Sequence, residues 1–291
     1  MFSGSIPALV TPFTAGRVDE EAYRVFVEWQ ITEGSTGLVP CGTTGEVATL
    51  SHEEQHRLFE LTIDQAKGRV PVIAGCGSNN TATAIEHMRV AADMGADAAL
   101  IVLPYYNKPS QAGLLAHFEA LVAASPLPII VYNVPGRTVA DISVETLTKV
   151  AKLPSVVGIK DATGSLGRVT AQRLQCGTDF CQLSGNDETS LGFNAMGGVG
   201  CISVSANVAP RLCAEFQAAC QGGRWDEALV LQDRLYPLHD AMFADASPGP
   251  AKYALSRVRP GFSTEVRLPM TEPSAEARRV VDAALAHAGL V

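Results

Sequence analysis

Short apolar segments alternate with longer segments of helical periodicity through the first two thirds of the chain, and this alternation limits the possible folds more than any other feature. Each short segment is rich in aliphatic residues and is bounded by Gly, Pro, Asn or Asp, a pattern typical of buried parallel strands. The eight segments are residues 6–10, 37–40, 70–74, 98–102, 128–132, 156–160, 181–184 and 200–203. Eight strands that alternate with helices predict a (β/α)8 TIM barrel rather than an open doubly wound sheet.

The helical segments between the strands carry their own boundary signals. Ser51 precedes a helix expected over residues 51–67, and Glu54 lies three residues later, as in a capping box. The pattern changes after about residue 208, where only helical periodicity remains. We therefore expect a catalytic barrel over residues 1–208, a final barrel helix to about residue 222, and a small helical C-terminal extension over residues 223–291.

The composition is that of an enzyme rather than of a nucleic-acid or membrane protein. The chain has 291 residues and a net charge of −8, which disfavours binding to nucleic acid or to an anionic membrane surface. No apolar run is long enough to span a membrane, and no signal peptide is evident. The seven cysteines are scattered without a CxxC pair, which indicates reduced thiols and a cytoplasmic location.

Lys160 ends the sixth predicted strand. Active sites of TIM barrels lie at the C-terminal ends of the strands. An amine shielded from water there loses its proton more easily and becomes a nucleophile towards carbonyl groups. Lys160 thus indicates Schiff-base chemistry, although the position alone also fits a lysine that only extends its amine to solvent.

Polar side chains follow several other predicted strands. The loop over residues 41–46 contains Thr43 and Thr44, whose hydroxyls and backbone N–H groups can hold a carboxylate; an ordinary turn is the alternative. Tyr106 and Tyr132 lie at the ends of the fourth and fifth strands, where they can pass protons or simply pack. Arg137 can bind a carboxylate with two hydrogen bonds, or remain a solvated loop charge.

Five motifs in order resemble the dihydrodipicolinate synthases, a pyruvate-dependent branch of the class I aldolase superfamily. They are GTTGE at 42–46, PYYN at 104–107, YNVPGRT at 132–138, GIKDATG at 158–164 and SGND at 184–187. The resemblance runs over nearly the whole chain. It implies a homotetrameric (β/α)8 enzyme that condenses pyruvate with aspartate-4-semialdehyde in lysine biosynthesis.

The resemblance also implies residue roles. Lys160 matches the Schiff-base lysine, and the proton relay matches Tyr132, Thr44 and Tyr106, the last entering from a neighbouring subunit. Residues that match substrate contacts are Thr43 for the pyruvate carboxylate, Arg137 for the carboxylate of the aldehyde, and Gly185 and Ile202 for backbone contacts. Because the imine itself accepts electrons, we expect no cofactor, and the sequence offers no metal-ligand cluster.

The chain departs from the family in the pocket that binds lysine in feedback-inhibited members. His52, Asn79 and Tyr105 match that pocket. Where such members carry a serine, a histidine and a glutamate, this chain has Val47, Gln55 and Thr83. The missing glutamate removes the acidic partner that a bound cation needs, so we expect weak or absent feedback by lysine.

Two other functions remain open at the level of sequence. A sister aldolase or lyase acting on N-acetylneuraminate or a keto-deoxy sugar acid would use the same lysine and strand-five tyrosine. Such enzymes usually differ at the second threonine and around the arginine, so Thr44 and Arg137 favour the synthase. A catalytically silent homologue that binds pyruvate or lysine would have lost a relay residue, whereas all four are present.

Overall fold

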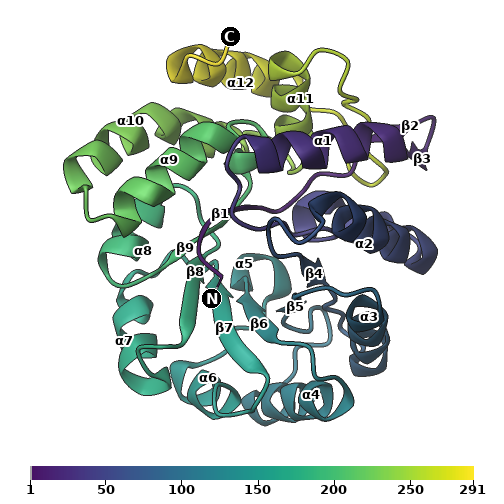
Figure 1. Cartoon of the computed structure of the whole chain (residues 1–291), viewed down its shortest axis with the longest axis vertical. Helices are drawn as coiled ribbons and strands as arrows, with labels where there is room; N and C mark the ends of the chain where they lie inside the picture. Colours follow the sequence, from purple (N-terminus) through teal and green to yellow (C-terminus); the bar gives the residue numbers. More distant parts are fainter. Residues whose placement is uncertain (1) are drawn as a thin grey trace.

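A computed structural model describes residues 2–291 and places seven parallel strands in one curled sheet. The order around the sheet is β1-β9-β8-β7-β6-β5-β4. The strands are β1 (Gly4–Pro7), β4 (Ile73–Gly75), β5 (Ala98–Val102), β6 (Ile129–Asn133), β7 (Val156–Asp161), β8 (Cys181–Ser184) and β9 (Gly200–Ser203). A parallel sheet curled in this way and surrounded by helices (Figure 1) confirms the predicted fold class.

The barrel wall is completed between β1 and β4 by a segment that is not a regular strand. Leu38 and Val39 form only isolated parallel bridges, Ala8 with Val39 and Leu38 with Val72. The sequence predicted a full strand over residues 37–40, and this prediction was wrong in extent. Backbone hydrogen bonds still join the segment to both neighbours: the Leu38 N–H donates to the Pro71 carbonyl at 2.9 Å and the Val39 N–H donates to the Pro7 carbonyl at 3.0 Å. Pro40 has no N–H to donate, which keeps the pairing short.

Helices surround the sheet, as Figure 1 shows. Those following the first five segments of the barrel wall are α1 (Glu20–Thr32), α2 (His52–Ala66), α3 (Thr81–Asp93), α4 (Gln111–Ala124) and α6 (Val144–Val150), and α2 lies where the sequence predicts it. The capping box of Ser51 and Glu54 at the start of α2 is confirmed. Next come α7 (Gly167–Cys176), α8 (Ser190–Ala195) and α9 (Pro210–Gln221). Short helical turns η1 (Thr43–Gly45), η2 (Val47–Thr49), η3 (Ser205–Asn207) and α5 (Pro135–Thr138) follow the strands, and a small hairpin pairs β2 (Phe13–Thr14) with β3 (Arg17–Val18).

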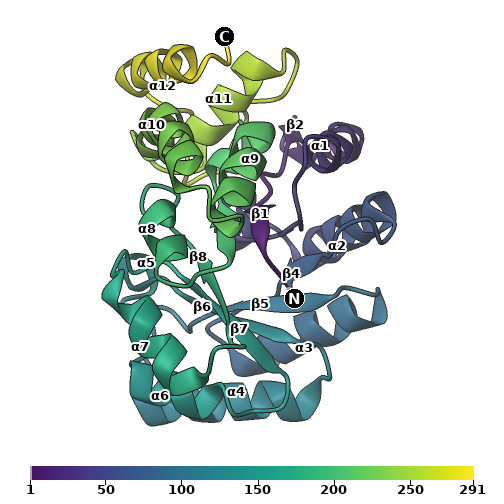
Figure 2. The same ribbon diagram turned by 60° about the vertical axis from the view of Figure 1, so that its left-hand side comes forward.

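Three further helices follow the barrel at one end of the molecule: α10 (Trp225–Ala241), α11 (Gly249–Val258) and α12 (Ala275–Ala288). Figure 2 shows α12 lying over α10 and α11, away from β5, β6 and β7. We propose the division near residue 222 on this arrangement. Among the described residues, none of the helices has the length and apolar character required to cross a membrane.

Alternate residues of each strand pack into two different apolar layers, one inside the barrel and one between the sheet and the helices. Side chains inside the barrel include Ile6, Leu100, Ile130, Leu183 and Ile202. Intervening residues such as Ile129, Val131 and Ile159 pack outwards against the helices. Because successive strand residues face opposite sides, a residue and its successor occupy different layers. This alternation determines which side chains reach the active end of the barrel.

Candidate active site

Lys160 and Tyr132 lie together inside the barrel near the C-terminal ends of β7 and β6. They are paired in the parallel register, so both side chains face the interior. The Lys160 Nζ lies 4.2 Å from the centroid of the Tyr132 ring, and Lys160 is only 5% exposed. A nearly dry amine beside a phenol is an arrangement suited to a nucleophile with a proton-transfer partner.

Gly185 makes room for the Lys160 side chain. A Cβ at residue 185 would lie 3.1 Å from Lys160 Cε and 2.6 Å from the Cβ of Ala162. The Gly185 N–H donates to the carbonyl of Asp161 at 2.7 Å, and this hydrogen bond holds the ends of β7 and β8 close together. Ile202 is fully buried in β9 among the same interior residues as Tyr132.

Thr43 and Thr44 lie in η1, above the segment that completes the barrel wall. Thr43 and Tyr132 both line a small cavity of about 30 Å³ inside the barrel mouth. Thr43 also lines a larger adjoining cavity of about 460 Å³, together with Arg137, an exposed residue of α5. Thr44 is buried within η1. The structure thus brings Lys160, Tyr132, Thr43 and Gly185 close together and places Arg137 at the entrance.

A buried ion pair anchors this threonine loop to the C-terminal extension. Lys252 of α11 donates to Glu46 Oε1 at 2.5 Å, and both side chains are almost completely buried. Lys252 also donates to the carbonyl of Glu265, while the backbone N–H of Arg267 donates to Glu46 Oε2 at 3.0 Å. Sequence reasoning missed this contact, although the acidic residue inside the GTTGE motif was a signal that a buried partner was needed.

Tyr106 is not brought to the site of its own chain. It is 90% exposed on the loop after β5. The adjacent Tyr105 lines the large cavity, and its carbonyl accepts a hydrogen bond from the Asn79 side chain at 3.2 Å. An exposed tyrosine beside the cavity entrance fits the expectation that it serves a neighbouring subunit, and this role stays a prediction.

The outer part of the large cavity is lined by the residues of the predicted lysine pocket. His52, Gln55, Thr83 and Tyr105 all face it, and Asn79 supports it through Tyr105. Glu46 is the one carboxylate among the lining residues, and it is already paired with Lys252. The cavity therefore offers no free acidic group to a cationic ligand.

Three histidines, His52, His56 and His87, gather beside this cavity. His56 Nε2 and His87 Nδ1 are 3.1 Å apart, so one ring must be neutral to accept the hydrogen bond of the other. Burial, together with the nearby His52 and His56, lowers the pKa of His87 from 6.5 to about 4. Burial also lowers the pKa of His56, and Glu86 partly opposes both shifts.

The histidines give a pH dependence of stability. Below pH 6.5 the unfolded chain binds a proton at His87, whereas the folded chain does not bind it until about pH 4. The free energy of unfolding should fall by about 2 kcal/mol over this window from His87 alone. Urea unfolding of wild type at pH 7.5 and pH 5 should show the loss, and His87→Gln should reduce it. Leu174→Gln, at an exposed position of α7, changes no titratable group and should leave the slope unchanged. An equal slope in all three proteins would contradict the assignment.

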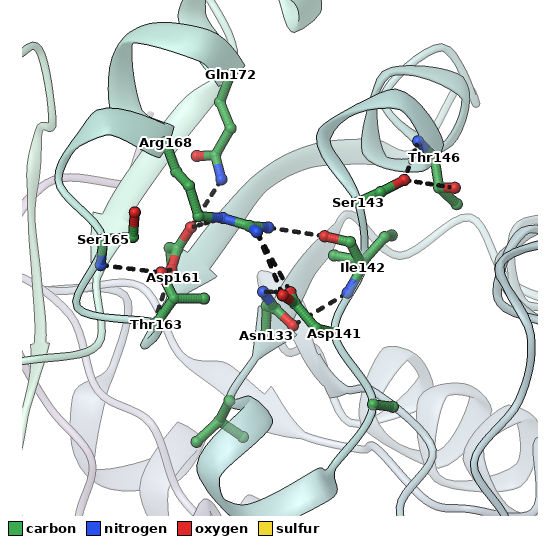
Figure 3. Close-up of polar contacts among 12 residues, drawn as sticks. Asn133, Asp141, Ile142, Ser143, Thr146, Asp161, Thr163, Ser165, Arg168 and Gln172 are labelled. Atoms are coloured by element: carbon green, nitrogen blue, oxygen red, sulfur yellow. Dashed lines mark hydrogen bonds and ion pairs between the residues drawn. The ribbon is translucent and has the colours of Figure 1, made fainter.

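A polar network lies behind the catalytic strand ends and was also missed from the sequence. Figure 3 shows Arg168 between the carboxylates of Asp161 and Asp141. Asp161 also accepts hydrogen bonds from Thr163 and Gln172. Among residues 2–291, we find no group of three or more His, Cys, Asp or Glu side chains placed to hold a metal ion.

Comparisons with known proteins agree on one family. The model of the dihydrodipicolinate synthetase family matches residues 1–288. A 4-hydroxy-tetrahydrodipicolinate synthase of Rhizorhabdus wittichii is 66% identical, with 100% of each chain covered. The structure of a chloride-inhibited dihydrodipicolinate synthase from Acinetobacter baumannii, complexed with pyruvate, superimposes with a TM-score of 0.97, 42% identity and 100% of each chain covered. A dihydrodipicolinate synthase from Cyanidioschyzon merolae with lysine bound gives a TM-score of 0.96 at 37% identity, covering 100% of this chain and 99% of that one.

Proposed function

Because this chain belongs to the dihydrodipicolinate synthetase family, we propose that it condenses pyruvate with L-aspartate-4-semialdehyde to give 4-hydroxy-tetrahydrodipicolinate, in the pathway to lysine. The observation that carries the proposal is the buried amine of Lys160 over the Tyr132 ring, in a chain that matches a synthase over its full length. The chemistry is that of an aldolase-type lyase. The cytoplasmic location expected from the cysteines stays a prediction.

The Lys160 amine attacks the ketone carbon of pyruvate, and loss of water gives an imine. Loss of a proton from the pyruvate methyl group then gives an enamine, whose carbon attacks the aldehyde. Each step moves a proton, and a hydroxyl can both donate and accept without carrying a charge. Tyr132, in contact with Lys160, is positioned for these transfers. We assign Thr44, buried in η1, as the next residue of the relay.

Two residues of the cavity carry the substrate carboxylates in this proposal. Thr43 lines both cavities, so its hydroxyl and backbone N–H can receive the pyruvate carboxylate next to Lys160. Arg137 lines only the larger cavity, further out, where the carboxylate of the semialdehyde would lie. Gly185 and Ile202 supply backbone groups around pyruvate. This separation assigns one carboxylate to each end of the site.

Tyr106 extends the proposal to the assembly. We propose a homotetramer in which Tyr106 of each chain completes the relay of a neighbour, since its ring is exposed beside the cavity entrance. Tyr106→Phe should lower kcat about tenfold or more while leaving the melting temperature unchanged. Tyr236→Phe, at a half-exposed tyrosine on α10, serves as the control. A Tyr106→Phe enzyme with the turnover of the control would remove Tyr106 from the relay.

The proposed function is tested by the choice of aldehyde. Pyruvate consumption should be measured with aspartate-4-semialdehyde, N-acetylmannosamine and glyceraldehyde at matched concentrations. We expect a large preference for the semialdehyde, lost in Arg137→Ala, because only that substrate places a carboxylate at Arg137. Preference for a sugar aldehyde would move the chain to the sister lyases. Inactivity with all three would point to a different aldehyde or to the silent homologue.

Feedback by lysine should be weak or absent, because the cavity has no free carboxylate for the lysine amines. The enzyme should keep most of its activity at millimolar lysine. Thr83→Glu introduces an acidic group at the cavity wall and should make lysine inhibition stronger. Initial rates of both proteins over a lysine titration provide the measurement, and inhibition of the wild type at low micromolar lysine would contradict the prediction.

A further inference from the structure

The strand residues that follow Tyr132 and Lys160 form a second pair on the opposite side of the sheet. Asn133 and Asp161 are in register, like Tyr132 and Lys160 one step earlier. Since successive strand residues face opposite sides, Asn133 and Asp161 point away from the barrel interior, and both are buried. Contacts that fix Asn133 and Asp161 therefore also fix the position of Tyr132 relative to Lys160.

Arg168 of α7 connects the two strands through that outer pair. Its Nε donates to Asp161 Oδ2 at 3.3 Å, and its guanidinium lies 3.4 Å from Asp141 Oδ1. Asp141 in turn accepts a hydrogen bond of 2.8 Å from the Asn133 side chain. Arg168 also donates to the carbonyl of Ile142 at 2.7 Å, which directs its planar head (Figure 3). The network therefore joins β6 to β7 by a route that does not use the backbone ladder.

The backbone ladder between β6 and β7 is regular from Ile130 to Asn133 but is interrupted before Ile130. The β6–β7 pairing shifts by one residue between Ile129 and Ile130, so the two strands are irregular at their start. The Arg168 network lies at the other end, one residue beyond Tyr132 and Lys160. The Arg168 side chain is 17% exposed and that of Asp161 is 3% exposed, so the contact is shielded from water and little screened.

We propose that Arg168 is a positioning residue, which holds Tyr132 against Lys160 by fixing Asn133 and Asp161 from behind. The inference rests on the proposed function, because it assigns Arg168 to the proton transfers between Tyr132 and the pyruvate imine. Arg168 itself touches neither substrate nor Lys160. Without it, Lys160 still forms the imine, but the tyrosine hydroxyl lies away from its productive position.

Arg168→Ala should lower kcat by about tenfold to a hundredfold, the loss expected when reacting groups are displaced by a fraction of an ångström to an ångström. The KM for pyruvate and the fraction of chains trapped by borohydride with pyruvate should stay close to wild type. Free guanidinium at non-denaturing concentration should restore part of kcat, relative to the same concentration of sodium chloride. Arg168→Lys, which keeps the charge but loses the planar fork, should recover little.

Arg69→Ala is the matched control. Arg69 pairs with Glu28 through two hydrogen bonds at the end of α2, far from the strand ends that carry Lys160. Should Arg168→Ala not fold, Asp141→Asn weakens the same connection more gently and should lower kcat several-fold. Two results would overturn this inference but not the proposed function. One is an Arg168→Ala enzyme that forms the pyruvate adduct and keeps the wild-type kcat. The other is an equal fall in kcat in Arg69→Ala. A wild type that borohydride cannot trap with pyruvate would overturn the proposed function, and this inference with it.

Discussion

Lys160→Ala should abolish the pyruvate adduct that borohydride reduction traps and should lower turnover by about 10⁴-fold or more, the range seen when a covalent nucleophile is removed. The expectation follows from burial: within the described residues, Lys160 is the amine that lies against Tyr132 inside the barrel. A methyl group at residue 160 cannot form an imine, and neighbouring groups cannot replace the lost electron sink. Mass spectrometry of the reduced protein provides the measurement.

A second lysine near the same strand serves as the control. Lys152 is exposed and precedes β7 at the opposite end of the barrel, so Lys152→Ala should be trapped and should turn over like wild type. Circular dichroism should show all three proteins folded. An adduct that persists in Lys160→Ala, located on another lysine, would refute the assigned nucleophile while leaving the family and fold unchanged.

Lys252→Met should destabilise the protein by about 3–5 kcal/mol, the cost of leaving a buried carboxylate without its partner. Glu46 would keep only the Arg267 N–H, and its side chain is 2% exposed. Glu46 also has a left-handed backbone, with φ +58°, which adds strain that the ion pair now opposes. The loss should appear as a lower midpoint of urea unfolding with an unchanged m-value.

An exposed ion pair provides the contrast. Lys149 and Glu145 are paired on the surface of α6, so Lys149→Met should cost less than about 0.5 kcal/mol. The double variant Lys252→Met with Glu46→Gln should recover much of the lost stability, because most of the penalty comes from the unpaired charge. If Lys252→Met and Lys149→Met were equally stable, the buried pair would have no special role.

The strands and most helices could be predicted because their signals are local. The strand predicted at residues 98–102 matches β5 residue for residue, and the helix predicted over residues 51–67 matches α2 to within one residue at each end. Lys160 and Tyr132 could be located for the same reason, since each ends an apolar run. The segment at residues 37–40 was also predicted as a strand, but it forms only isolated bridges. Pro40 has no N–H to donate, and the effect of this on the pairing depends on the neighbouring strands.

Contacts between distant residues could not be predicted in the same way. Glu46 and Lys252 are 206 residues apart, and the sequence around either residue does not indicate that the other is its partner. Arg168 and Asp161 are only seven residues apart, but the meaning of their contact depends on Asp141 and Asn133 across the sheet. Likewise, no local signal around His56 or His87 shows that α2 and α3 bring the two rings together.

The groups of the site rest on parts of the barrel wall that differ in their resistance to local opening. Lys160 and Tyr132 lie in β7 and β6, within a continuous ladder, whereas Thr43 and Thr44 follow the Leu38–Val39 segment, which has only isolated bridges. Amide protons of that segment should exchange with solvent sooner than those of β6 and β7. Under mild heating or denaturant, we therefore expect binding of the substrate carboxylate by Thr43 to weaken first. Lys160, which forms the imine, should still lie in folded β7.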